Sequence, residues 1–249
     1  MRAGGSLPVT VFRERYMRNC PHRRAIVVFI SLLVCCASAG AQVTLGKLNN
    51  FQDLATENWG QGPFSPVPSF IVANGGPTGT GDAFLENVST GSSGAGGRQA
   101  LFNAIDWVGN FTAAGVTRIE AQMTNLGQTG LSMRLGIEDA NGTRYVSTTA
   151  IPLAADAQWH SLSFGITPSD LSLDRGFESP DAALATVTSF RFMSSSNPTF
   201  QGDQIASTLG IDNIHALPEP GATLIFAAGA VFIVRRRKKP ESFGELSGV

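Results

Sequence analysis

Cysteine and histidine are scarce in this 249-residue chain, and each shortage excludes a class of site. All three cysteines, Cys20, Cys35 and Cys36, precede residue 42. The rest of the chain therefore offers neither a disulfide framework nor a cysteine-ligated metal. His160 and His215 are the only histidines beyond that point, and neither has the spacing of a metal site or a nucleophile motif. We expect both to be surface or strand-end residues.

Positive charge is also scarce in the middle of the chain. Residues 42–216 contain 7 Lys or Arg against 15 Asp or Glu. This acidic balance argues against nucleic acid as a partner, because phosphate binding needs a basic face. The remaining positive charge gathers at 13–24 and 235–239, beside apolar runs, which is typical of membrane-targeted segments.

The first 41 residues have the three-part pattern of a secretory signal peptide. A basic stretch at 22–24 precedes an apolar run at 25–36 and small residues at 37–41. Cleavage after Ala41 fits best, and cleavage after Ala39 is the second choice. The alternative is an N-terminal membrane anchor or a buried helix, although the run is short for a spanning helix. Met17 is an alternative start. The implied partners are Sec-type export machinery and signal peptidase.

A second tripartite segment occupies residues 217–239. The motif Pro218, Glu219, Pro220 precedes an uncharged apolar run at 222–234. A basic cluster then follows, made of Arg235, Arg236, Arg237, Lys238 and Lys239. At about 1.5 Å per residue this run reaches roughly 21 Å, short of a hydrocarbon core of about 30 Å. We expect a short transmembrane helix that is retained transiently in the inner membrane, with its basic end in the cytoplasm.

This order of motif, apolar helix and basic cluster resembles the PEP-CTERM sorting signal of Gram-negative bacteria. The resemblance implies that an exosortase-type membrane protease cuts near Pro218–Pro220 and passes the protein to the cell surface. It also implies an exopolysaccharide-producing host. The polar tail 240–249 departs from the family, whose members usually end soon after the basic run. The alternative is a plain C-terminal tail anchor.

The middle of the chain is rich in short runs that alternate apolar and polar residues. Such period-2 runs include 118–123, 131–138, 161–166 and 190–192, and each predicts a strand with one buried face. Asn141-Gly142 separates two such runs and predicts a hairpin turn. Only 181–187 suggests a short helix, with Ser179 and Pro180 at its start.

Eight or more short strands predict an all-β fold for residues 42–216. We expect a single jelly-roll β-sandwich, flanked by the signal peptide and the short transmembrane helix. A repeat array is the structural alternative, but no recurring period is present. The Gly- and Ser-rich stretch 91–97 is expected to be a loop, because a strand pattern resumes directly after it.

The ends of this region resemble the galactose-binding-like jelly rolls of carbohydrate-binding modules. The residues concerned are 51–53, then Trp59, and the closing strand 209–214. In such modules the first and last strands often share a structural Ca²⁺, which implies Asp53 and Asp212 as its ligands here. The alternative is that Asp53 is a turn residue and Asp212 a solvated edge residue.

Flat aromatic rings suit sugar stacking, and Trp59, Trp107, Trp159 and Tyr145 are the candidates. Trp107 and Trp159 are expected in the core or its rim, and Trp59, in a Gly- and Pro-rich loop, is the candidate for exposure. A hydrolase needs two carboxylates across one cleft, which a pair such as Asp82 and Glu138 could supply.

We therefore expect an exported, non-enzymatic surface or matrix protein of a Gram-negative-type bacterium, binding polysaccharide. The alternative is a secreted carbohydrate-active enzyme of jelly-roll fold.

Overall fold

The computed structural model describes residues 42–219. The signal segment with Ala39 and Ala41, and residues 220–249 with Pro220, the apolar run and the basic cluster 235–239, lie outside the described residues. Within residues 42–219, no helix combines the length and the apolar character needed to cross a bilayer.

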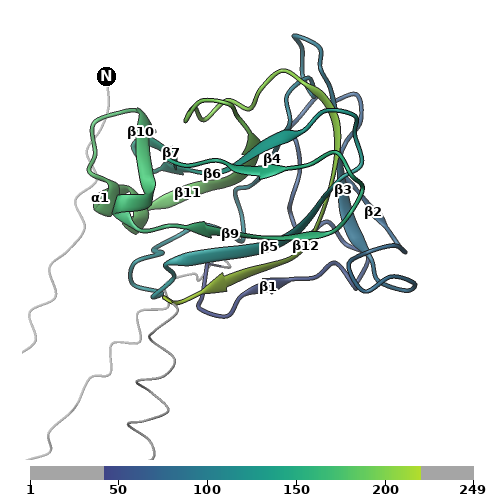
Figure 1. Cartoon of the computed structure of the whole chain (residues 1–249). Helices are drawn as coiled ribbons and strands as arrows, with labels where there is room; N and C mark the ends of the chain where they lie inside the picture. The colour runs from purple at the N-terminus through teal and green to yellow at the C-terminus, as the bar shows by residue number, and fades with distance from the viewer. Residues whose placement is uncertain (1–41, 220–249) are drawn as a thin grey trace, which may run out of the picture. The chain divides into compact units, whose positions relative to one another are not determined.

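Two six-stranded antiparallel sheets form the domain and face each other (Figure 1). The β12 sheet has the order β2-β3-β12-β5-β9, with β1 also paired to β12. Its strands are β1 (Leu48–Asn49), β2 (Phe70–Val72), β3 (Phe84–Thr90), β5 (Arg118–Asn125), β9 (His160–Gly165) and β12 (Ala206–Leu217).

The β6 sheet has the order β10-β7-β6-β11-β4, with β8 also paired to β6. Its strands are β4 (Ala100–Asn103), β6 (Leu131–Asp139), β7 (Arg144–Ser147), β8 (Ile151–Leu153), β10 (Leu171–Arg175) and β11 (Val187–Ser194). The helical elements in the described residues are η1 (Pro168–Asp170) and α1 (Pro180–Ala185). The expected all-β sandwich is confirmed, and its two sheets are consistent with a jelly roll.

The alternating runs place their apolar side chains between the sheets. The apolar members of the four runs are buried: Ile119, Ala121, Met123, Leu131, Met133, Leu135, Ile137, Leu162, Phe164, Ile166, Phe190 and Phe192. Successive side chains of a strand point to opposite faces of its sheet. The polar partners on β6 and β11 therefore point to the outer face of the β6 sheet.

Aromatic rings fill one end of the core. Trp59 stacks on Phe192 with 5.6 Å between ring centroids, and Trp107 lies 5.4 Å from Phe190. Both indole nitrogens donate to the side-chain oxygen of buried Asn49, at 2.9 Å for Trp59. One amide therefore satisfies two buried N–H groups, which would otherwise lower the stability of the fold.

Local chemistry explains the predicted turn and helix. Gly142 has φ +78°, which only glycine adopts without steric cost, and it closes the β6–β7 hairpin. Asp139 Oδ1 accepts from the backbone N–H groups of Asn141 and Thr143, both at 2.8 Å. Ser179 caps α1 by accepting from Ala182 N at 3.2 Å.

Candidate ligand-binding face

One row of side chains crosses the outer face of the β6 sheet. The strand register places Phe102 of β4 beside Arg191 of β11, and Arg191 beside Gly136 of β6. Gly136 in turn lies beside Val146 of β7. The glycine leaves a gap in the middle of this row.

The segment after β11 fills that gap. In Figure 1 the green-to-yellow segment that joins β11 to β12 rises over the β6 sheet. Its Phe200 is 1% exposed, although it lies on the outer side of the sheet. A Cβ on Gly136 would lie 3.0 Å from the Phe200 ring and 2.6 Å from Met193 Cε. We name residues 195–204 the cover loop.

Buried Arg134 anchors the cover loop to the sheet. Its Nε donates to Ser195 O at 2.8 Å, and its Nη2 donates to Ser196 O at 3.3 Å. Its Nη1 donates to Ser147 O and Thr148 O, at 2.6 and 2.8 Å. Burial lowers the pKa of Arg134, and Asp203 partly opposes this shift. The guanidinium thus ties the loop to β7 through backbone carbonyls.

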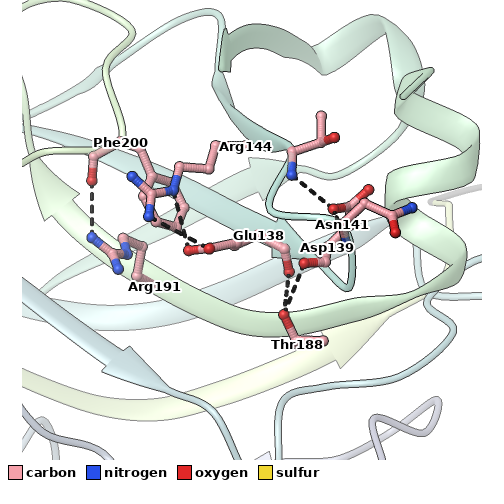
Figure 2. A network of polar contacts seen from close by, with 8 residues as sticks. Glu138, Asp139, Asn141, Arg144, Thr188, Arg191 and Phe200 are labelled. Atoms are coloured by element: carbon pink, nitrogen blue, oxygen red, sulfur yellow. Dashed lines mark hydrogen bonds and ion pairs between the residues drawn. The ribbon is translucent and has the colours of Figure 1, made fainter. Parts of the chain in front are cut away.

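Two further guanidiniums hold the Phe200 ring. The Arg191 guanidinium carbon lies 3.7 Å from the ring centroid, and that of Arg144 lies 4.9 Å away. Figure 2 shows both arginines beside Phe200, with Arg191 Nη1 donating to Phe200 O at 3.0 Å. Arg144 also forms an ion pair with Glu138, with 3.2 Å between Nε and Oε2. Cation–π contacts of this kind fix the planes of the guanidiniums.

The positive charge of Arg191 is only partly offset by nearby carboxylates. Burial lowers its pKa to about 10, and the like charge of Arg144 adds to the shift, while Glu138 and Asp174 oppose it. It therefore stays charged at neutral pH. Its Nε is buried and has no hydrogen-bond partner among the described residues.

Three shallow cavities lie in sequence along this face. The first, about 360 Å³, lies at the β6–β7 hairpin and includes Glu138, Arg144 and Phe177. The second, about 300 Å³, shares Arg144 with the first. It shares Arg98 and Gln201 with the third, which measures about 200 Å³ and includes Arg191. Because neighbouring cavities share lining residues, the three form one row along this face, and we name this row the groove.

One fully exposed aromatic ring lines the groove, and a second exposed ring lies near it in the chain. Phe177 lines the first cavity and is fully exposed. Phe64 is 91% exposed, and its neighbour Ser65 donates to Gln61, which lines the third cavity. Exposed apolar rings favour contact with a ligand, because covering them removes apolar surface from water.

The expectation that Trp59 is exposed is wrong. Its side chain is 3% exposed, because the loop carries it into the core against Trp107, Phe190 and Phe192. Trp59 therefore has no exposed face on which a sugar ring could stack.

The other aromatic candidates do not replace Trp59 as a stacking platform. Trp107 and Tyr145 are also buried, the former as expected. Trp159 lies half-buried at the rim, edge-on to Phe84 at 5.2 Å, and it donates to Gly75 O.

The two aspartates expected to share calcium lie in different surroundings, one exposed and one buried. Exposed Asp53 accepts from Ala55 N at 3.0 Å, the arrangement of a turn residue. Asp212 is fully buried, not solvated, and accepts from Asn213 N at 2.7 Å. The acidic groups that act on Asp212 are Asp82 and Glu57. No group of three or more His, Cys, Asp or Glu able to hold a metal occurs in residues 42–219, so backbone oxygens, amide oxygens or waters would have to complete any calcium shell.

Burial raises the pKa of Asp212 to about 7. Burial also raises the pKa of Glu57, with smaller opposing and reinforcing effects from Phe51 N and Asp53. Glu57 is half-buried and its charge acts on buried Asp212, and neither residue lines the groove.

The remaining candidates fall in separate places. Pro218 and Glu219 follow the last residue of β12 directly, and Glu219 is exposed. Asp82 accepts from Gln52 and Thr78 in the loop before β3, whereas Glu138 lies on the other sheet, so the two do not share the first cavity. His160 and His215 are both half-buried, and His160 pairs with Asp156.

Sequence reasoning missed Arg98, Arg191, Phe177 and Phe200. Arg191 was visible as the polar residue between Phe190 and Phe192, which assigns it to the outer face. Nothing in the sequence indicated that a loop would fold back over that face.

No protein-family model and no curated protein sequence matches the chain. Among solved structures, an exo-beta-agarase is similar over 70% of this chain, with a TM-score of 0.52 and 13% identity. The chain spans 25% of the length of that agarase. At this identity the likeness shows a shared fold.

Two further structures are more distant. A family 11 carbohydrate-binding module from Clostridium thermocellum, in complex with a beta-1,3-1,4-mixed-linked tetrasaccharide, has a TM-score of 0.45 and 18% identity, over 71% of this chain and 100% of that one. A putative glycoside hydrolase from Bacteroides thetaiotaomicron has a TM-score of 0.39 and 15% identity, over 71% and 72%. The chain is thus a two-sheet β-sandwich whose neighbours among solved structures include carbohydrate-binding modules and glycoside hydrolases.

Proposed function

We propose that this domain is a non-enzymatic module that binds a polysaccharide along the groove. The observation that carries the proposal is the row of three adjacent cavities, which share the lining residues Arg144, Arg98 and Gln201. A depression that is long and shallow suits several units of a chain molecule better than one small molecule, which prefers an enclosed pocket.

The groove has the chemistry that sugar rings require. Phe177 at one end and Phe102 at the other offer aromatic faces that can stack on the apolar side of a pyranose. Asn141 and Gln201 add amide groups that both donate and accept. Together these groups supply apolar contact and hydrogen bonds along the same line.

The carboxylates of the groove favour binding over hydrolysis. Glu138 is held by its ion pair with Arg144. Asp203 accepts from Ser196 N at 2.7 Å and from the Ser196 hydroxyl at 3.3 Å. Asp174 and Asp203 share the middle cavity with Arg98 and Arg144, so a hydrolytic alternative would use these two.

We further propose that the protein is exported and sorted to the cell surface through Pro218-Glu219-Pro220. The motif begins at the first residue after β12, and Glu219 is exposed. A protease could therefore reach this position without opening the sheet. The partners are then Sec-type machinery, signal peptidase, an exosortase-type protease and, at the surface, exopolysaccharide.

Affinity electrophoresis of the purified chain through gels containing different polysaccharides tests the binding proposal. Phe177→Ala should weaken the retarding interaction about tenfold, since stacking of an aromatic ring contributes roughly 1 kcal/mol or more. The matched control is Leu45→Ala, because Leu45 is also exposed but lies beside β1. Equal retardation of Phe177→Ala and parent in every gel would contradict the proposed groove.

A hydrolysis assay on the same polysaccharides separates the two functional classes. We expect no release of reducing ends. Release that is abolished in Asp174→Asn or Asp203→Asn would show the enzyme instead.

A further inference from the structure

The positive charges of the domain are concentrated on one side. Residues 42–219 contain seven Lys or Arg and sixteen Asp or Glu. Five of the seven belong to the groove or to its support: Arg98, Arg134, Arg144, Arg175 and Arg191. The two others, Lys47 and Arg118, belong to the β12 sheet side, where Arg118 pairs with Glu120. Because the domain is acidic as a whole, this concentration of arginines gives one face the ability to select ligands by their charge.

The five arginines differ in how their charge is compensated. Arg144 pairs with Glu138, and the first cavity balances Arg144 and Arg175 against Glu138 and Glu178. The second cavity balances its two arginines against Asp174 and Asp203. The third cavity contains Arg98 and Arg191 and no carboxylate. Two guanidiniums therefore face one cavity without an acidic partner in it.

Both guanidiniums are held in place by neutral groups. Arg98 Nη1 donates to Gly202 O at 2.7 Å, and Arg191 Nη1 donates to Phe200 O at 3.0 Å. Within the described residues neither forms an ion pair with a carboxylate. Their remaining N–H groups match the two or three oxygens of a carboxylate or sulfate.

We infer that the cavity between Arg98 and Arg191 binds the acidic group of an anionic polysaccharide, either the carboxylate of a uronic acid or a sulfate ester. This inference rests on the proposed function and names its substrate class. Phe102 and Gln61 line the same cavity and contact the sugar that carries the acid. The carboxylates of the middle cavity repel a second acid there, so the ligand places a neutral or less charged unit at Asp174 and Asp203.

The charge state of the site agrees with this role. The pKa of Arg191, lowered to about 10 by burial and by Arg144, remains well above neutral pH. A bound anion relieves the repulsion between these neighbouring arginines, so binding should also stabilise the fold.

Matched pairs of polymers test the inference. The purified full-length chain is titrated with polygalacturonate and its carboxyl-reduced neutral counterpart, and with dextran sulfate and dextran. The first pair reports a carboxylate ligand, and the second reports a sulfate. We expect the acidic member of at least one pair to bind at least about tenfold more tightly, with affinity falling as salt rises.

Two variants and one control localise the binding. Arg98→Gln, at an exposed position, should weaken binding of the acidic polymer about tenfold and lower the melting temperature only slightly, through loss of its hydrogen bond to Gly202 O. Arg191→Gln should weaken it at least as much, and Arg191→Lys should restore it only in part, because lysine lacks the planar fork. Arg118→Gln, which removes the same charge from the other sheet, should leave binding unchanged.

The outcomes are distinguishable. Equal binding of acidic and neutral polymers, still sensitive to Phe177→Ala, overturns the anionic ligand and leaves the polysaccharide module intact. If the chain binds none of the four polymers and no exopolysaccharide of the host, both the anionic ligand and the polysaccharide-binding module are overturned. Equally tight binding of single-stranded DNA, or equal weakening by Arg118→Gln, shows general attraction of polyanions and overturns the site.

Discussion

At the residue scale, Asp212 is the group whose environment departs most from that of a free aspartate. Its carboxyl is buried in the bulge of β12, and this burial raises its pKa from 3.8 to about 7. A raised pKa means that the folded state holds a proton which the unfolded state releases. The stability that this proton contributes is fully present below about pH 4 and is lost as pH rises towards 7.

Asp212→Asn tests this linkage, because asparagine imitates the protonated acid. In the presence of chelator, the melting temperature of the parent should fall relative to that of the variant between pH 5 and pH 8. Thermal melts followed by circular dichroism measure the difference in melting temperature between the two proteins. The contributions of all other titrating groups cancel in this difference, because both proteins share them. A difference that stays constant from pH 5 to pH 8 would show that Asp212 is ionised throughout.

Calcium remains a prediction at the same residue. A cation at Asp212 competes with the proton, so added Ca²⁺ should raise the melting temperature more at pH 8 than at pH 5. Saturation at 100 to 1,000 times the dissociation constant corresponds to about 2.7 to 4.1 kcal/mol. Asp212→Ala should abolish the gain, and Asp53→Ala decides whether Asp53 takes part. An unchanged melting temperature of the parent with and without chelator would exclude the ion.

At the element scale, the cover loop is the feature that turns a plain sheet face into a groove. Phe200→Ala removes a ring that fills the gap above Gly136 and spaces Arg144 from Arg191. We expect a loss of about 3 to 5 kcal/mol in the free energy of unfolding, as for other buried Phe→Ala changes. Urea denaturation measures it.

The control for that prediction is Phe64→Ala. Phe64 is 91% exposed, so its truncation should change stability by no more than about 0.5 kcal/mol. If Phe200→Ala is equally mild, the cover loop does not pack on the sheet in solution.

Strands were predictable from the sequence, whereas the cover loop was not. Leu131, Met133, Leu135 and Ile137 alternate with polar residues because one face of β6 is buried, so the sequence itself carries the period. Residues 195–204 have no period, and their position depends on contacts with Gly136 and Arg134, which lie about sixty residues earlier. Such long-range contacts leave no local pattern.

The burial of Trp59 also depends on contacts that the local sequence does not reveal. A Gly- and Pro-rich loop predicts exposure on average, but Asn49 and Phe192 provide a hydrogen-bond acceptor and a stacking partner inside the core. The groove arginines were recognisable as scarce positive charges in an acidic region. Their gathering on one face followed only from the register of β4, β11, β6 and β7.

At the scale of the whole molecule, export and sorting predict the ends of the mature chain. N-terminal sequencing of protein from the native host should begin near Gln42, and mass spectrometry should show that residues 235–239 are absent. Replacing Pro218 and Glu219 with alanine should leave the full C-terminus in place, because the processing signal is lost. Surface protein that still carries Val249 would contradict sorting by cleavage.

β12 runs through the middle of its sheet, with β5 on one side and β3 followed by β1 on the other. Its last residue, Leu217, is where the sandwich continues into the C-terminal segment. A pulling force applied there acts along the strand, at right angles to its interstrand hydrogen bonds. The bonds are then loaded in shear and must break together, which resists mechanical extraction far better than unzipping one pair at a time. If the domain is attached through this segment while it binds a polymer in flowing water, the load therefore falls on the paired length of β12 as a whole.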